Sequence, residues 1–519
     1  MLSKFRILPA QLRNNRFLLL LALVNFLLHI LTNTQWLGYG YFRDELYYLI
    51  CAERLAWGYV DHPPLSIFLL AVSRLLFGAS PFALRLFPAV VGALVVILTG
   101  LMARQLGGGK WAQALAALAI ALAPIHLIMG SFYSMNAFEI FFWTLGAYLL
   151  TVLLTEDKPK FWLAVGMVIG LGLENKHTML TFALALGVGL VLTPARQYLK
   201  SKWLWLGGLL AVLLLAPNLL WQVQNGLPSL EFYKVAEIQK NVPTAPLEVF
   251  LNQLLVMNPV NAPIWLAGLG YYLFAGKMRA VRALGIVYLV LLGLLLVAQS
   301  SRPDRIAGAY PMLLAAGAVA LEQLSRRYLT PTGGRRLMMA GVFALCLASI
   351  VFIPVSVPLL PSAFTSKLAL AVGAAQEIEK GKRAALPQYM ADRFGWVELV
   401  NQVADIYHQL SPQDQAKVVI FADNYGEASA INFLGRVYGL PPAISGHNNY
   451  FLWGPGNANG EIVIAIGDSI LAKRTVFAEV TKTATFHCQY CIEDGVGIYV
   501  AKDLKIPLNE LWPTVKHYE

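Results

Sequence analysis

The chain has 519 residues, of which 57% are hydrophobic and only 13% are charged. Soluble proteins carry roughly 25% charged residues, so this composition excludes an ordinary cytosolic globular protein and a disordered one. The net charge of +11 is not spread evenly, because residues 1–360 carry 27 basic and 13 acidic residues whereas residues 361–519 carry 13 and 16. Loop orientation in a membrane explains the basic excess, and we expect no nucleic-acid partner.

Apolar windows of about 20 residues, long enough to cross a hydrocarbon core of ~30 Å, recur through the first 360 residues. They predict eleven membrane-spanning helices near 17–37, 83–103, 112–130, 137–154, 161–173, 177–193, 203–221, 258–276, 283–299, 307–324 and 337–358. The first window is long and ten others follow it, so we do not expect a cleavable signal peptide.

Basic residues predict the orientation of these helices. With the N-terminus in the cytoplasm, the inner connections contain 18 Lys and Arg and the outer connections contain eight. This bias is typical of a multi-pass protein of the bacterial inner membrane, and an odd number of spans places the tail outside. Acidic residues show the reverse distribution, with three inside and ten on the outer side of residues 1–360. These ten acids, drawn from separate loops to one face, predict an assembled site.

The outer connections and the tail complete the predicted architecture. Connections 38–82 and 222–257 are long, and the first contains amphipathic segments typical of helices at the membrane interface. In the tail, β-rich runs at 417–422, 461–466 and 497–501 alternate with helix-like segments at 426–438 and 468–474, and another helix is expected at 395–410. The predicted fold class is therefore a polytopic α-helical membrane domain over 1–360, followed by an extracytoplasmic α/β domain over 361–519 with a largely parallel sheet.

Three polar clusters of the first 150 residues could support chemistry. Asp44 and Glu45 follow the first span, where a partly desolvated carboxylate can act as a general base. Asp61 and His62 offer either a phosphate contact or a pair of metal ligands. Glu139 begins an otherwise apolar span, where an unpaired carboxylate would be costly.

Two further clusters carry positive charge on the outer face. Lys176 follows Asn175 in a polar interruption between apolar runs, and Arg302 and Arg305 flank Asp304. Guanidinium groups match phosphate geometry better than ammonium groups do. Each cluster also has a plain structural explanation, such as a solvated loop, a tight turn with a snorkelling lysine, or contact with anionic lipid.

The order of these motifs resembles the GT-C fold glycosyltransferases, in particular the bacterial relatives of protein O-mannosyltransferases and of the lipid A aminoarabinose transferase. The likeness covers about residues 1–310. It rests on Arg43-Asp44-Glu45, Asp61-His62-Pro63-Pro64, Glu139 with Phe141 and Phe142, and Asn175-Lys176.

The resemblance implies transfer of a sugar from a polyprenyl monophosphate donor to a hydroxyl acceptor on the outer face, usually with inversion. The acceptor would be a lipid, a glycan or a protein. By position, Asp44 would activate the acceptor hydroxyl beside Glu45, and Glu139 would help shape the site. Relatives often follow the second acid with Lys, whereas this chain has His62 after Asp61. We therefore expect the donor phosphate to be bound by a wider set of residues, namely His62, Lys176, Lys240, Arg302 and Arg305.

The pattern requires no cofactor, but Asp61, His62 and a loop carboxylate such as Glu237 could bind a divalent metal. Cys488 and Cys491 form a Cys-x-x-Cys motif, and an outer location favours a short disulfide over a thioredoxin-like role.

Alternatives remain open for the tail and for the whole chain. The segment 423–427 follows a strand and precedes a helix, a position where α/β sheets bind ligands, so the tail could recognise the acceptor or only cap the membrane site. A transporter or lipid flippase with a fused outer domain is the second hypothesis. Transporters tend to show internal repeats and charges at the bilayer midplane, which this sequence does not display.

Overall fold

A computed structural model describes residues 15–32, 37–375, 377, 379–381, 384–467 and 476–519. The chain forms two compact units. The helical unit comprises Met1–Thr34, Arg85–Leu219 and Pro243–Leu359, and the α/β unit comprises Gln35–Leu84, Leu220–Val242 and Leu360–Glu519. The α/β unit therefore contains the whole of the connection 38–82, part of the connection 222–257, and the tail.

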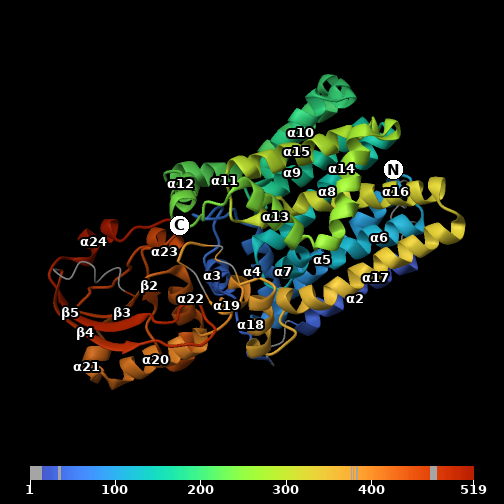
Figure 1. Cartoon of the computed structure of the whole chain (residues 1–519). Helices are drawn as coiled ribbons and strands as arrows, with labels where there is room; N and C mark the ends of the chain where they lie inside the picture. The colour runs from blue at the N-terminus through green and yellow to red at the C-terminus, as the bar shows by residue number, and fades with distance from the viewer. Residues whose placement is uncertain (1–14, 33–36, 376, 378, 382–383, 468–475) are drawn as a thin grey trace. The chain divides into compact units, whose positions relative to one another are not determined.

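The helical unit contains a helix at each of the eleven predicted spans (Figure 1). Its helices are α2 (Arg16–Thr32), α5 (Pro81–Gln105), α6 (Lys110–Ala121), α7 (Pro124–Gly130), α8 (Met135–Glu156), α9 (Trp162–Asn175), α10 (Met179–Val191), α11 (Lys202–Gln224), α13 (Pro246–Val256), α14 (Ala262–Phe274), α15 (Arg282–Val297), α16 (Tyr310–Tyr328) and α17 (Pro331–Ser356). A 3-10 segment, η7 (Pro303–Ala309), precedes α16.

Only some of these helices are long enough to span a membrane as a single helix. Within the described ranges, five segments are long and apolar enough: α5, α8, α11, Pro303–Tyr328 and α17. Counting the bent pairs α6 with α7 (61°) and α10 with Pro194–Lys200 (107°) raises the number to seven. The other predicted spans hold shorter helices, such as the 13 residues of α14, which at ~1.5 Å per residue do not cover ~30 Å. The protein is a multi-pass membrane protein, and its eleven spans stay a prediction.

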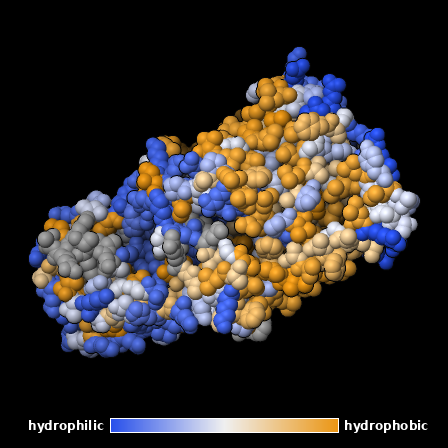
Figure 2. Space-filling view, in the orientation of Figure 1, coloured by the Kyte–Doolittle hydropathy of each residue, from blue (hydrophilic) through white to orange (hydrophobic). Residues whose placement is uncertain are grey.

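Apolar side chains cover much of the outer surface of the helical unit. Only 17% of the most apolar window of α11, and the same share of that of α17, is buried. Leu213 on α11 and Phe343 and Ile350 on α17 are 60–68% exposed. Figure 2 shows hydrophobic residues over most of the visible face of this unit. Such a surface would be unfavourable in water and is expected to face lipid.

Glycine allows two helices of this unit to pack with their backbones in contact. A Cβ atom built on Gly268 of α14 would lie 2.0 Å from the carbonyl oxygen of Leu313 on α16, and one on Gly317 would lie 1.8 Å from that of Ile264. Close approach through small residues is a common way to associate helices in membranes, where burial of apolar surface provides little driving force.

The α/β unit combines short helices with one five-stranded sheet (Figure 1). Its helices are α3 (Arg43–Glu53), α4 (Leu65–Phe77), α12 (Pro228–Gln239), α18 (Ser362–Ala371), α19 (Gln388–Ala391), α20 (Trp396–Gln409), α21 (Pro412–Gln415), α22 (Tyr425–Leu434), α23 (Asn449–Trp453) and α24 (Leu508–Leu511). Its strands are β1 (Val418–Ala422), β2 (Ala443–Ile444), β3 (Ile462–Ile466), β4 (Phe477–Thr485) and β5 (Gly497–Leu504). The three predicted strands and the helices near 395–410 and 426–438 are confirmed, and the helix predicted at 468–474 lies outside the described residues.

The sheet is mixed, so the prediction of a largely parallel sheet was wrong. The strand order is β2-β1-β3-β5-β4, with β2, β1 and β3 parallel but β5 antiparallel to both β3 and β4. β4 and β5 are consecutive strands joined without a crossover helix, a connection that gives antiparallel pairing. Strand β4, which was not predicted, has the sequence FAEVTKTAT. Its side chains are mostly exposed, and it contains no continuous apolar run.

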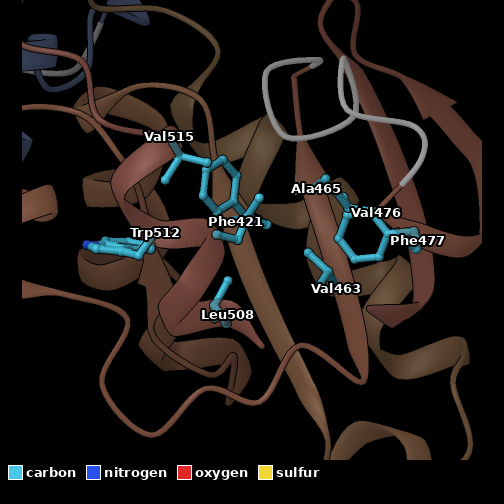
Figure 3. Packing of buried hydrophobic residues seen from close by; sticks show 10 residues of the cluster. Phe421, Val463, Ala465, Val476, Phe477, Leu508, Trp512 and Val515 are labelled. Carbon is cyan, nitrogen blue, oxygen red and sulfur yellow. The ribbon is translucent and has the colours of Figure 1, made fainter. Parts of the chain in front are cut away.

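One hydrophobic cluster ties the end of the chain to the sheet. Phe421 of β1 and Val463 of β3 pack with Leu508, Trp512 and Val515 from the last segment (Figure 3). This contact fixes the course of the residues that follow Val515.

The structure differs from the expected disulfide. Cys488 and Cys491 are free thiols, and the Cys491 thiol donates a hydrogen bond to the Cys488 carbonyl at 3.5 Å. A separate interaction between the two side chains, in which the Cys491 thiol donates to the Cys488 sulfur, lowers the pKa of the Cys488 thiol to about 7.

The α14–α16 contact yields a stability prediction. Gly268→Val should prevent the close approach and lower the apparent melting temperature of the purified protein by several degrees, because the backbone atoms it meets cannot move aside cheaply. Gly270→Val is the matched control, since a Cβ there meets nothing within 4 Å. Equal melting temperatures for the two variants would contradict this packing.

Candidate active site

Asp44 lies in the first turn of α3, and its carboxylate is held by the tail. The neighbouring Glu45 accepts a hydrogen bond from the main-chain N–H of Phe42 at 2.9 Å, so it caps the helix and is fully buried. Asp44 remains partly accessible, with 28% of its side chain exposed. Its Oδ1 accepts a hydrogen bond from the Tyr425 hydroxyl at 2.9 Å. Within the described residues, no hydrogen bond reaches its Oδ2.

The adjacent residue, Arg43, is a buried cation that links three segments. Its guanidinium lies 3.3 Å from Glu379 and 3.7 Å from both Asp392 and Asp44. It also lies 5.5 Å from the centre of the Tyr425 ring. A Cβ on Gly426 would come within 2.6 Å of the Arg43 side chain, so the start of α22 needs glycine there. A buried guanidinium is stable only when paired, and these contacts provide the pairing.

Lys240, at the end of α12, contributes a second cation to the same surroundings. Its ammonium lies 5.8 Å from the centre of the Tyr425 ring and 6.0 Å from that of Phe232. Burial lowers the pKa of Lys240, while Glu379 opposes the change. Asp44, Lys240 and Tyr425 therefore bring the connections 38–82 and 222–257 and the tail together within the α/β unit.

Asp61 and His62 adjoin this group but face aromatic rings. The Asp61 carboxylate accepts a hydrogen bond from the Tyr47 hydroxyl at 3.0 Å and lies 3.9 Å from His62 Nε2. Burial raises the pKa of Asp61, and His62 opposes the change. The His62 side chain is fully buried, with the rings of Tyr48 and Tyr59 centred 4.7 and 4.8 Å away. A donor-phosphate contact by His62 therefore stays a prediction.

Among the residues that the structure describes, no third His, Cys, Asp or Glu side chain lies close enough to share an ion with the predicted pair Asp61 and His62. Across the described part of the chain, the one group of three His, Cys, Asp or Glu side chains close enough to share an ion does not include Asp61, His62 or Glu237. Metal binding by these residues also stays a prediction.

In the helical unit, Glu139 and Lys176 form a buried ion pair. The Lys176 ammonium donates hydrogen bonds at 2.7 Å to Glu139 Oε2 and to Asn136 Oδ1. The Thr178 hydroxyl donates to the other Glu139 oxygen, and the Asn175 side chain donates to the Met135 carbonyl at 2.9 Å. Glu139 is only 5% exposed, so the carboxylate expected to be costly in an apolar span is paired.

Arg302 and Arg305 occupy the segment that leads into α16. Arg302 donates to Asp304 at 3.1 Å and keeps a side chain that is 35% exposed, and Arg305 is exposed. η7 packs against α8, and Lys176 interacts electrostatically with Asp304. The structure thus gathers Glu139, Lys176 and Arg302 within the helical unit.

Sequence reasoning missed several partners of the predicted residues. It singled out segment 423–427 from its position after a strand, but nothing in the pattern linked Tyr425 to Asp44. Glu379 and Asp392 lie in the tail without a recognisable motif, and only the structure pairs them with Arg43.

Comparison with known proteins supports the expected resemblance. The sequence model of the family described as dolichyl-phosphate-mannose-protein mannosyltransferase matches residues 61–221. An uncharacterized protein of Aquifex aeolicus (strain VF5) is 30% identical over 161 residues, or 30% of this chain and 32% of that protein. The Bacillus subtilis (strain 168) protein named "Putative mannosyltransferase YkcB" is 29% identical over 162 residues, or 31% of this chain and 22% of that protein. The matched region thus spans about a third or less of each relative.

The whole structure has a similar counterpart among solved structures. ArnT from Cupriavidus metallidurans bound to undecaprenyl phosphate superposes with a TM-score of 0.58 at 17% identity, covering 94% of this chain and 98% of that one. The chain has the GT-C fold. The resemblance expected from the order of the motifs is confirmed at the level of the fold.

The ion pair in this GT-C fold yields a second prediction. Lys176→Met should leave a buried, unpaired carboxylate at Glu139 and destabilise the protein by about 3–5 kcal/mol. The double variant Lys176→Met with Glu139→Gln should regain part of this loss, because no charge is then left unpaired. Thermal unfolding in detergent measures both. Lys158→Met breaks an exposed pair and should have little effect. A double variant no more stable than the single one would refute the pairing argument.

The buried Asp392 yields a prediction about pH. Burial raises its pKa from 3.8 to about 7, although Arg43 opposes the change. Between pH 4 and pH 7, Asp392 keeps its proton in the folded protein but loses it in the unfolded chain. Its contribution to the free energy of unfolding is therefore complete below about pH 4 and is lost as the pH rises to 7. The Asp392→Asn side chain stays neutral at every pH. The melting temperature of this variant minus that of wild type should therefore be about 2–4 °C larger at pH 8 than at pH 5. The exposed Asp405→Asn is the control, and a pH-independent difference for Asp392→Asn would contradict the prediction.

Proposed function

We propose that this protein is a membrane glycosyltransferase that moves a sugar from a polyprenyl-phosphate donor to a hydroxyl acceptor on the outer face of the bacterial inner membrane. The observation that carries the proposal is the position of Asp44, whose Oδ1 is anchored by Tyr425 while its partly exposed Oδ2 has no hydrogen bond among the described residues. A carboxylate with one oxygen fixed and the other available is suited to take a proton from an acceptor.

The GT-C fold and the relatives support the choice of donor. ArnT, in a structure that holds undecaprenyl phosphate, superposes along nearly its whole length. The description of the family that matches residues 61–221 names dolichyl-phosphate-mannose. We extend this donor class to the present chain. No observation favours the transporter hypothesis.

The proposed reaction is a single displacement. The acceptor hydroxyl gives its proton to Asp44 Oδ2 as its oxygen attacks the anomeric carbon of the sugar. The bond between that carbon and the phosphate oxygen breaks, and polyprenyl phosphate leaves with the electron pair. One displacement inverts the configuration at the anomeric carbon.

Cations are needed where the phosphate gathers negative charge. We assign this role in the α/β unit to Lys240, since Arg43 is already paired with Glu379 and Asp392. In the helical unit we assign it to Arg302, Arg305 and Lys176, of which Arg305 and Arg302 are the more exposed. Glu139 then orients Lys176 through the buried ion pair.

The test is transfer by full-length protein in lipid nanodiscs, with polyprenyl-phosphate sugars extracted from membranes and an envelope extract as the source of acceptors. Asp44→Asn should lower the rate of sugar transfer by about 10²–10⁴-fold, because it removes the proton acceptor. Its melting temperature should stay close to that of wild type. Asp405→Asn, an exposed change on α20, should transfer sugar normally. Turnover by folded Asp44→Asn near the wild-type rate would overturn the proposal.

A further inference from the structure

Two cysteines that take no part in the proposed displacement lie together in the α/β unit. Cys488 and Cys491 belong to the loop 486–496, which connects β4 to β5. The main-chain N–H of Phe486 donates to the Val496 carbonyl at 2.7 Å and closes the base of this loop. The sheet thus fixes both ends of the loop that carries the two thiols.

The loop packs against the segment that precedes α20. The ring of Tyr490 is centred 6.2 Å from that of Phe394, and Ile492 packs in the same hydrophobic cluster as Met390. A Cβ on Gly395 would lie 3.2 Å from both cysteine sulfur atoms, and the φ of this residue is +89°. Glycine is therefore favoured there, and the two thiols lie side by side against it.

Hydrogen-bond donors surround the Cys488 sulfur. The hydrogen bond from the Cys491 thiol, together with those from the main-chain N–H groups of Tyr490 and Cys491, lowers the pKa of Cys488 to about 7. Burial and the Glu398 carboxylate oppose this change. Gly395 is the N-cap residue of α20, a helix of 14 residues whose N-terminus is capped by no described side chain. A helix N-terminus also favours a thiolate beside it.

The two thiols differ in access and in acidity. Cys488 is partly exposed, whereas Cys491 is buried. Donation to the Cys488 sulfur raises the pKa of the Cys491 thiol, and burial adds to this effect. A low pKa and solvent access beside a second thiol are typical of reactive cysteines. A stabilised thiolate also stabilises the reduced pair, so a disulfide formed here is easier to reduce than a structural one.

We propose that Cys488 and Cys491 form a redox-active pair that exchanges with small disulfides, with Cys488 as the nucleophile and Cys491 as the resolving thiol. The Cys488 thiolate attacks one sulfur of the disulfide, the S–S bond breaks, and the other half leaves as a thiolate that takes up the proton lost by Cys488. The Cys491 sulfur then attacks the Cys488 sulfur and displaces the second half, which takes up the proton of Cys491. Two cysteine thiols are thus oxidised, and one disulfide is reduced to two thiols.

The loop of this pair also contacts an element that holds Asp44. Glu493, two residues after Cys491, accepts a hydrogen bond from the Asn424 side chain at 3.5 Å. Asn424 caps the helix whose first residue, Tyr425, donates to Asp44. Reaction of the pair would thus alter a loop beside this cap without involving the Asp44 carboxylate. The proposal does not depend on sugar transfer, because its test measures thiol chemistry.

The experiment uses full-length protein in detergent, reduced and then freed of reductant. Glutathione disulfide is the probe, alkylation blocks the remaining thiols, and mass spectrometry of peptides identifies the state of each cysteine. We expect the wild type to form the Cys488–Cys491 disulfide and to return to two thiols in excess reduced glutathione. A disulfide that persists in reduced glutathione and yields only to dithiothreitol would be a structural bond, and this result would overturn the proposal.

Two variants separate the roles of the thiols. Cys491→Ser should accumulate a mixed disulfide between Cys488 and glutathione, because no second thiol displaces it. The serine hydroxyl keeps a hydrogen-bond donor beside the Cys488 sulfur. Cys488→Ser should leave Cys491 unmodified, because that thiol is buried. Unchanged melting temperatures check that both variants fold.

The matched control is Asp405→Cys, at an exposed position on α20, combined with Cys488→Ser and Cys491→Ser. At pH 6 a pKa of about 7 rather than ~8.5 gives Cys488 about 30-fold more thiolate, and the lower nucleophilicity of that thiolate offsets part of this gain. Cys488 should therefore react about fivefold faster than the control. If Cys491→Ser does not fold, the rate of thiol loss in the wild type decides. Equal rates, or an adduct on Cys491 in folded Cys488→Ser, contradict the assigned roles and overturn the proposal.

Discussion

Burial of one guanidinium organises the α/β unit. Arg43 is removed from water at the start of α3, and its charge can be retained only beside carboxylates. Glu379 supplies one from the tail at 3.3 Å, the Asp392 side chain lies 3.7 Å away and becomes a carboxylate as the pH rises through its pKa of about 7, and the main-chain N–H of Arg43 donates to the Asp392 carbonyl at 3.1 Å. Because Asp44 is the next residue on the same helix turn, fixing Arg43 also fixes Asp44 beside the Tyr425 hydroxyl.

In the helical unit, a second buried charge is likewise stabilised by a partner of opposite charge. Glu139 would destabilise an apolar helix if it stood alone, but Lys176 and Thr178 donate hydrogen bonds to its two oxygens, and Asn136 accepts a second hydrogen bond from Lys176. This arrangement accounts for a carboxylate and an ammonium that hydropathy alone marks as anomalies. It also holds the Lys176 ammonium near Asp304, the ion-pair partner of Arg302.

Much of the architecture could be predicted, and the errors have physical causes. β1 and β3 were recognised because both are continuous apolar runs, as expected of strands buried on both faces. β4 was missed because its side chains are mostly exposed and polar, and without it the sheet was taken as largely parallel. Asp44, Glu139 and Lys176 stood out because ionisable groups are rare near apolar spans, whereas Asp392 and Tyr425 resemble any residue of an ordinary α/β domain.

The sequence by itself determined three properties of this chain. It is a membrane protein, its apolar helices occupy particular segments, and particular charged residues border those segments. These properties follow from composition and from periodicities that extend over a few turns of a helix or a few residues of a strand. Only the tertiary structure decided that Tyr425 donates to Asp44 and that Gly395 lies against the thiols of Cys488 and Cys491. The first contact joins residues 381 positions apart, and such pairs are chosen by packing of the whole unit, to which no local pattern of residues is sensitive.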